Sequence, residues 1–287
     1  SILLKKWEIH TDKNNNGDNI IFDIVNQIKE VTPNLQEVIG YGIGIPGPVV
    51  HNYIPVCVNL GWKNVDLKGA LSDQLQNDNI YVANDANMAT LGEAAFGAAK
   101  GYKNVALLTL GTGVGSGIVV EYEIVEGYNG AAGELGHMKI ESSFDLPCNC
   151  GKNNCLETVA SATGIKNVYY GMRKTYQGTS TLFDFETPSA KAIFDQAILG
   201  DELANMVVDY SSYYIGYACH VLSATTNPSV IVIGGGVSKA GEFLINKIDK
   251  YFKEFLFSPV KETKIVQATL GNDAGIYGGC ELVTKHG

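Results

Sequence analysis

Residues 104–120 have the sequence NVALLTLGTGVGSGIVV, in which two apolar runs flank a glycine turn at Gly111, Thr112 and Gly113. Short apolar runs bounded by glycine are typical of buried β-strands, so we predict two strands joined by this turn. The turn lies between strands rather than before a helix, and it therefore matches neither the Rossmann fingerprint nor the Walker loop. Its backbone N–H groups could face a phosphate, and a plain β-turn is the alternative.

A second glycine turn follows a later apolar run, in SVIVIGGGVS at residues 229–238. The pattern predicts a strand, a turn at Gly234, Gly235 and Gly236, and the start of a helix. Glycine at such a turn lets a nucleotide approach the main chain. Two glycine turns, taken with an acidic residue at a strand end, favour phosphate chemistry over two unrelated turns.

Strands and helices alternate outward from these turns, which predicts an α/β fold. The region from 155 to 226 is helical with no strong strand, and this shift in pattern predicts two lobes, residues 1–100 and 101–287. A cleft between two lobes is the expected ligand site. The predicted strands begin at 1, 37, 79, 104, 114, 229 and 264, and the further predicted helices cover 20–31, 66–77, 86–101 (with Gly101 as the stop) and 272–283.

The composition narrows the classes of partner. The 287 residues carry a formal net charge of -9 and no basic run, which argues against a nucleic-acid partner. The longest apolar stretches are too short, or too interrupted by glycine, to span a membrane. The start shows no charged segment followed by an apolar run, so we expect no secretion signal and a cytoplasmic protein.

One histidine and three cysteines form a cluster in residues 136–157, GHMKIESSFDLPCNCGKNNCLE. The pattern is His137, then Cys148, Cys150 and Cys155. Three thiolates and one imidazole are a ligand set typical of structural Zn²⁺, and four protein ligands leave no position open for an activated water. Reduced surface cysteines, or a disulfide to Cys155, are the alternatives. The other cysteines, Cys57, Cys219 and Cys280, lie in apolar contexts typical of buried thiols.

Two carboxylates, Glu134 and Glu157, flank the cluster. A metal that gathers the cluster, which spans the loop 137–155, would bring these carboxylates near each other. Together they could orient several hydroxyl groups, which favours a polyol ligand. Two exposed surface glutamates are the plainer alternative.

Asn84 and Asp85 follow an apolar strand in YVANDAN and precede a helix. In open α/β sheets ligands bind at the carboxyl ends of strands. An aspartate in that place can accept a proton from a hydroxyl nucleophile. Capping of the following helix by either residue is an equally local explanation.

Taken together, these stretches resemble bacterial glucokinases of the ROK family (repressor, open reading frame, kinase). GIGIPGPV, CVNLGW, NDAN, LTLGTGVGSG, GAAGELGH, CNCGKNNCLETVASATG and VIVIGGGVS occur in the family's order and spacing, over nearly the whole chain. The most specific part is GELGH followed by C-x-C-G-x-x-x-C-L-E. The resemblance implies an actin-like, hexokinase-type (ribonuclease H-like) fold, in which two α/β lobes close over a cleft. It also implies ATP-dependent phosphorylation of glucose at O6, in glycolysis, by a homodimer.

The resemblance further implies a role for each matching residue. Asp85 would be the general base that accepts the 6-hydroxyl proton, and Mg²⁺ would bridge the phosphates of ATP. His137 would serve two ligands, with one ring nitrogen on zinc and the other toward the sugar. The sugar would be held by Asn84, Glu134, His137 and Glu157, the phosphates by Gly111, Thr112 and Gly113, and the adenosine by Gly234, Gly235 and Gly236.

The chain departs from the family pattern in three places. It has no D-x-G-G-T loop, which in the family contacts ATP phosphates, and we expect the family's opening hairpin to precede SILLKKWEIHT. Asn154 stands where the family usually has glycine, and Asn tolerates the left-handed conformation, so we expect the turn to persist. Ser116 also replaces a usual glycine, and we expect its small side chain to fit.

Three other functions stay open. A kinase of the same family for another hexose, such as fructose or an N-acetylated hexosamine, would carry the same carboxylates. A sugar-binding regulator of the family would bind DNA through a winged helix-turn-helix, which this sequence does not contain. A sugar-binding protein without kinase activity is the third.

Overall fold

The computed structural model describes residues 2–32 and 34–286. Its largest sheet has five strands in the order β7-β6-β5-β8-β9. The glycine-linked pair β5 and β6 is antiparallel, whereas β8 pairs in parallel with β5 and with β9. The strands are β5 (Val105–Leu110), β6 (Val114–Val120), β7 (Glu123–Ile124), β8 (Val230–Gly234) and β9 (Lys264–Gln267). The two strands predicted around residues 111–113 are therefore confirmed.

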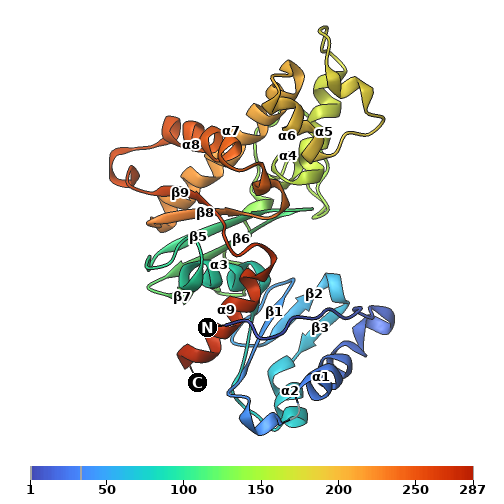
Figure 1. Cartoon of the computed structure of the whole chain (residues 1–287), viewed down its shortest axis with the longest axis vertical. Helices are drawn as coiled ribbons and strands as arrows, with labels where there is room; N and C mark the ends of the chain where they lie inside the picture. The colour runs from blue at the N-terminus through green and yellow to red at the C-terminus, as the bar shows by residue number, and fades with distance from the viewer. Residues whose placement is uncertain (1, 33, 287) are drawn as a thin grey trace.

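Helices cover both faces of this sheet (Figure 1). One face carries the largest apolar core, which includes Leu108, Ile231 and Ile233 from the sheet. Leu107, Val230 and Val232 alternate onto the other face, where they pack with Leu91 and Ala94 of α3. The covering helices are α4 (Glu157–Ala160), α5 (Ala162–Arg173), α6 (Ala190–Ile198), α7 (Glu202–Thr226) and α8 (Glu242–Phe255) on the first face, and α3 (Asp85–Phe96) and α9 (Ala274–His286) on the second.

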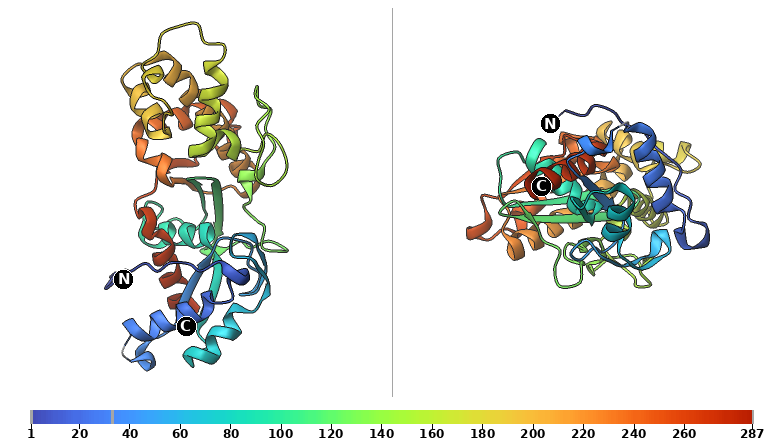
Figure 2. Two further views of the ribbon diagram at one scale, coloured as in Figure 1. Left: turned by 90° about the vertical axis from the view of Figure 1, so that its right-hand side faces the viewer. Right: turned by 90° about the horizontal axis from the view of Figure 1, so that it is seen from below.

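A smaller unit lies at the other end of the elongated molecule (Figure 2). It has two two-stranded sheets, a parallel one from β1 and β4 and an antiparallel one from β2 and β3. Its separate core includes Val25, Leu67 and Ile80. The elements are α1 (Ile20–Val31), β1 (Tyr41–Ile45), β2 (Ile54–Cys57), β3 (Trp62–Val65), α2 (Leu67–Leu75) and β4 (Ile80–Asn84).

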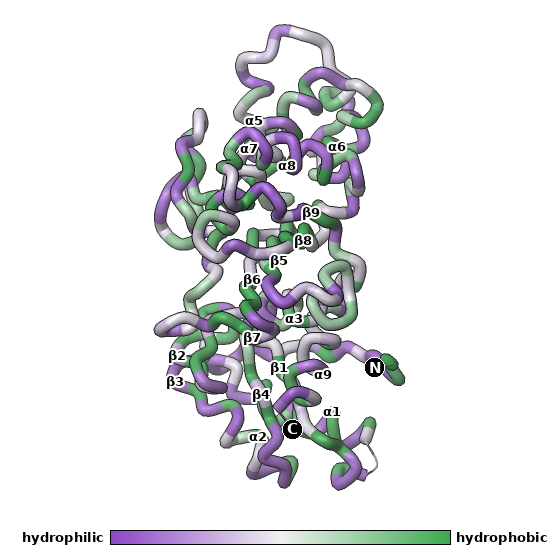
Figure 3. Tube along the Cα trace, turned by 90° about the vertical axis from the view of Figure 1, so that its left-hand side faces the viewer, coloured by the Kyte–Doolittle hydropathy of each residue, from purple (hydrophilic) through white to green (hydrophobic). Residues whose placement is uncertain are grey.

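The predicted α/β class is confirmed, as are the helical region from 155 and the last helix. The lobe boundary at residue 100 stays a prediction, and α9 from the end of the chain packs against both α3 and β1. Figure 3 shows apolar residues concentrated in the central strands and mixed polarity along the outer helices, as amphipathic elements require. No helix within the described ranges is long and apolar enough to cross a bilayer.

Two predicted elements are wrong. Residues 2–13 form no strand, and Ser1 lies outside the described residues. A strand needs a hydrogen-bonded neighbour, and the apolar side chains of Ile2 and Leu4 are 85% and 92% exposed instead of packed. The helix predicted to stop at Gly101 ends at Phe96, because Gly97 leaves the helical conformation with φ -109° and ψ -146°.

Candidate active site

A cavity of about 1300 Å³ lies between the two units and draws its lining from both. Its walls come from the ends of β4, β5, β8 and β9 and from the loops that follow them, as expected where strands of an α/β sheet end. The structure brings ten of the predicted site residues into this one cleft: Asn84, Asp85, Gly111, Thr112, Gly113, Glu134, His137, Glu157, Gly235 and Gly236. Gly234 is buried inside β8 instead.

Asp85 begins α3 at the point where β4 ends. Water reaches its carboxylate through the cleft, yet the surrounding protein displaces enough solvent to raise its pKa above the ordinary value of 3.8. A hydrogen bond from the Ala86 N–H to Asp85 Oδ1 (2.9 Å) opposes that rise. The result is a carboxylate with increased proton affinity that lies in an open cleft.

Asn84 explains the capping alternative, because it is the N-cap of α3. Its Oδ1 accepts from the N–H groups of Ala86 (2.9 Å) and Asn87 (3.2 Å), and its Nδ2 donates to the Gly47 carbonyl (3.2 Å). Because the Asn84 side chain caps the helix, the neighbouring Asp85 carboxylate is not needed as the cap. Capping by Asn84 is therefore compatible with another role for Asp85.

The glycine turn between β5 and β6 is held by Glu157, the first residue of α4. The Val114 N–H donates to Glu157 Oε2 at 3.0 Å. A Cβ at Gly113 would lie 2.3 Å from the same oxygen, so only glycine fits there without a shift. Glu157 and the glycine turn are thus in direct contact.

Glu134 lies on a loop that is hydrogen-bonded to β6. It precedes the short helix Leu135–His137, and its side chain is exposed in the cleft. The buried Ser116 hydroxyl donates to the Gly133 carbonyl and accepts from the Leu135 N–H at 3.3 Å. Ser116 therefore fits, as predicted, and it ties β6 to the two residues on either side of Glu134.

The cluster His137, Cys148, Cys150 and Cys155 forms as predicted, with its ligand atoms within 4.8 Å of one another. Cys148 Sγ lies 3.6 Å from His137 Nδ1, and Cys150 Sγ lies 3.6 Å from Cys155 Sγ. A tetrahedral ion with bonds of about 2.3 Å separates neighbouring ligand atoms by about 3.8 Å, so the donor set fits a metal. All three cysteines are free, which excludes the disulfide alternative in this structure.

Burial raises the pKa of Cys155 to about 12, so a bound cation is what would keep it a thiolate at neutral pH. Asn154 supports the loop in the left-handed conformation expected of it, with φ 58°. Its side-chain Oδ1 accepts from the Leu146 N–H at 2.8 Å. The cluster adjoins the cleft, because Cys148 Sγ also lies 3.8 Å from Glu157 Oε1.

Several cleft residues escaped the sequence analysis. Asn59 comes from the short 3-10 helix after β2, and Lys239 from the one after β8. Gln267 and Thr269 lie at and just beyond the end of β9, and the Gln267 Nε2 donates to the Ser238 carbonyl at 2.9 Å. The strand-end argument that singled out Asp85 applies equally to β9, whose carboxyl end meets the same cleft.

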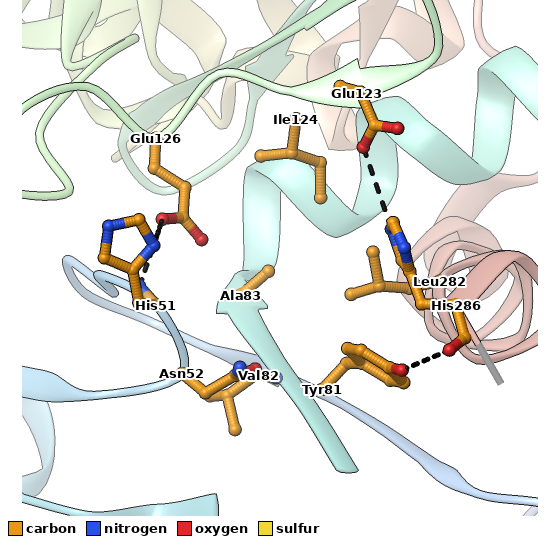
Figure 4. Close-up of a pocket in the computed structure, with 10 residues that line it drawn as sticks. All are labelled: His51, Asn52, Tyr81, Val82, Ala83, Glu123, Ile124, Glu126, Leu282 and His286. Carbon is orange, nitrogen blue, oxygen red and sulfur yellow. Dashed lines mark hydrogen bonds and ion pairs between the residues drawn. The ribbon is translucent and has the colours of Figure 1, made fainter. Parts of the chain in front are cut away.

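A second cavity, of about 450 Å³, lies where the two units join (Figure 4). It is lined by β4, β7, α9 and the residues around Asn52. The His51 backbone N–H donates to Glu126 Oε2 at 3.1 Å, and the Tyr81 hydroxyl donates to the His286 carbonyl at 2.8 Å. No predicted site residue lines it, so its contacts join the units away from the catalytic candidates.

The protein has a two-unit α/β fold with an aspartate at a strand end in the cleft. Its likeness to solved hexokinase and glucokinase structures places the fold in the hexokinase-type class. The chain belongs to the ROK family, whose model matches residues 2–286.

Two of the curated relatives that are named glucokinase match nearly the whole chain. The one from Halalkalibacterium halodurans is 40% identical, with 99% of this chain and 88% of that protein covered. The one from Thermotoga maritima is 34% identical, with 99% and 90% covered. The structure of a ROK glucokinase from Streptomyces griseus with glucose and AMPPNP is 27% identical, with a TM-score of 0.76 and 97% and 91% covered. Xylose repressors match at lower identity.

Proposed function

We propose that this protein is an ATP-dependent glucokinase, which transfers the γ-phosphoryl group of MgATP to O6 of glucose. The observation that carries the proposal is the place of Asp85. Its carboxylate lies in one cleft with the polar wall of Glu134, His137 and Glu157 and with the glycine turn at 111–113. The curated glucokinase relatives support the choice of glucose.

In the proposed reaction Asp85 accepts the proton of the 6-hydroxyl as that oxygen attacks phosphorus. The raised pKa of Asp85, caused mainly by burial, makes it a better proton acceptor than an ordinary aspartate. Asn84, Glu134, His137 and Glu157 orient the sugar hydroxyls. Orientation and electrostatic stabilisation supply most of the catalysis in phosphoryl transfer, so their fixed positions matter as much as the base.

The phosphates would lie against Gly111, Thr112 and Gly113, and the adenosine against the turn at 234–236. Both turns support these placements because Gly111, Thr112 and Gly113, and likewise Gly235 and Gly236, line the cleft. The phosphoryl donor and acceptor would then meet at Asp85.

We propose that the Cys/His cluster holds a structural Zn²⁺. The donor set and its spacing fit that ion. With Nδ1 directed to the metal, the other ring nitrogen of His137 is free to face the sugar. Cytoplasmic location, a role in glycolysis and a homodimeric state stay predictions.

The proposal is tested by ADP release from MgATP with glucose, fructose, mannose and N-acetylmannosamine as acceptors. We expect glucose to give the highest kcat/KM. Higher kcat/KM with another sugar would move the assignment to a kinase of the same family for that sugar. Binding of glucose by calorimetry without ADP release from any sugar would instead indicate a sugar-binding protein.

A further inference from the structure

Glu93, near the end of α3, is a charged residue that the proposed reaction does not use. Its side chain is 0% exposed. No ion pair within residues 2–32 and 34–286 involves it, so no lysine, arginine or histidine there neutralises it. Burial of a lone carboxylate is costly unless hydrogen bonds replace water, and the negative end of its own helix adds to the cost.

The hydrogen bonds that replace water come mainly from one loop. Glu93 Oε1 accepts from the backbone N–H groups of Thr269 (3.0 Å) and Leu270 (2.8 Å). Oε2 accepts from the Ala98 N–H (2.7 Å) and from the Thr269 hydroxyl (3.4 Å). Every partner donates, so the position requires an acceptor on both oxygens.

Gly97 makes this arrangement possible, because a Cβ there would lie 2.0 Å from Glu93 Oε2. The early end of α3 at Phe96, which the sequence did not indicate, therefore lets the carboxylate fold over the helix end. From there it reaches the segment that follows β9.

That segment, residues 268–273, lines the same side of the cleft as the turn at Gly235 and Gly236. Ala268, Thr269 and Asp273 all contribute to the lining. Glu93 itself does not line the cleft. It fixes two consecutive backbone N–H groups of the segment from behind, and so it sets where the segment's cleft-facing atoms lie.

The other end of α3 carries Asp85, eight residues away, which is about 12 Å along a helix. Glycines hold α3 tightly against α9: a Cβ at Gly92 would lie 2.0 Å from the Ala274 carbonyl oxygen, and one at Gly278 would lie 1.8 Å from that of Met88. One rigid helix thus connects the candidate base to the segment on the nucleotide side.

We propose that Glu93 is a positioning residue for the phosphoryl donor, which anchors the segment 268–273 against α3 at a fixed distance from Asp85. This inference rests on the proposed kinase function. It concerns the donor alone, since none of the sugar-side residues is bonded to Glu93.

Glu93→Gln tests the inference with little change in size. The amide places an N–H₂ group where only acceptors fit, so at least one backbone donor loses its partner and the segment shifts. We expect KM for MgATP to rise about tenfold to a hundredfold, with kcat reduced. Glucose Kd by calorimetry and metal content should stay within about twofold of the parent.

Two further variants separate positioning from general destabilisation. Glu93→Asp keeps two acceptor oxygens on a shorter side chain, so it should recover part of the MgATP affinity and serves if Glu93→Gln does not fold. Val168→Ala, in the buried core of α5, should lower Tm with KM for MgATP unchanged. Equal losses of glucose and MgATP affinity in Glu93→Gln, or an unchanged KM for MgATP, would overturn the inference.

Failure of the proposed function gives a different result. If the parent protein phosphorylates no sugar, a non-hydrolysable ATP analogue still reports donor binding by calorimetry. Weaker analogue binding by Glu93→Gln than by the parent would then support the positioning role, and equal binding would refute it.

Discussion

The two sides of the cleft are built in different ways. The proposed sugar side presents the side chains of Glu134, His137 and Glu157, which adjoin a Cys/His cluster able to hold a metal. The proposed nucleotide side is lined by two glycine turns, at Gly111–Gly113 and Gly235–Gly236, and by the segment 268–273. Its segment 268–273 is held from behind by one buried carboxylate. The comparison predicts that the two sides can be damaged separately.

The largest effect should come from Asp85, where the two sides meet. Asp85→Asn keeps the size of the side chain and removes the proton acceptor. We expect kcat to fall about 10² to 10⁴-fold while glucose affinity is nearly unchanged. Steady-state kinetics and calorimetry measure the two quantities, and Asp73→Asn, on the exposed surface of α2, is the matched control. Retained turnover would remove Asp85 from the role of base.

Damage to the metal cluster should weaken the proposed sugar side more than the proposed nucleotide side, which it reaches only through the bond of Glu157 to the Val114 N–H. Cys150→Ser removes one of the four ligands, so the loop that holds the metal changes its geometry. That change moves the ligand His137, and it moves Glu157 because Glu157 Oε1 lies 3.8 Å from the ligand Cys148. We expect lower metal content and a loss of about tenfold to a hundredfold in glucose affinity. Metal analysis and glucose titration check both, with Cys280→Ser outside the cluster as control. Parent protein that contains no bound metal would contradict the proposed structural zinc site and its support of the sugar-binding residues.

A smaller effect is expected from Ser116→Ala. The variant loses the hydroxyl that joins β6 to Gly133 and Leu135, on either side of Glu134. A hydrogen bond of this kind contributes about 1 kcal/mol, so glucose affinity should fall a few-fold with MgATP affinity unchanged. Ser258→Ala, exposed and distant, should change neither. An unchanged glucose Kd in Ser116→Ala would mean that the loop holds Glu134 without it.

The smallest effect concerns stability and pH. Because the folded protein raises the pKa of Asp85 above 3.8, it binds more protons than the unfolded chain between the two pKa values. The stability that protonated Asp85 contributes to the folded protein is therefore lost as pH rises through that interval. Asp85→Asn should thus have a higher Tm than the parent at pH 7, with the difference gone below about pH 3.5. Thermal melts across pH measure it, and a lower Tm for the variant at pH 7 would show that the charge is stabilised.

The difference between the sides also explains what the sequence could predict. His137, Cys148, Cys150 and Cys155 are chemically distinctive and close in sequence, so the cluster was predicted correctly. The paired strands of residues 104–120 were predictable because glycine and apolar runs act locally.

Long-range contacts were not predictable in this way. The interaction of Glu93 with Thr269 joins residues 176 positions apart. The sequence pattern predicted a helix that continues to Gly101, and in such a helix Glu93 would not lie near the helix end. The strand predicted at the start had the right alternation but finds no partner among the described residues. Both misses involve hydrogen bonds whose partner is defined only by the tertiary fold.

The most direct test of two separately built sides is calorimetric titration of Cys150→Ser and Glu93→Gln, each with glucose and with a non-hydrolysable ATP analogue. We predict that Cys150→Ser loses more affinity for glucose than for the analogue, and that Glu93→Gln loses more affinity for the analogue than for glucose. Parallel loss of both ligands in both variants would contradict the account, because it would show that the cleft is held as one unit.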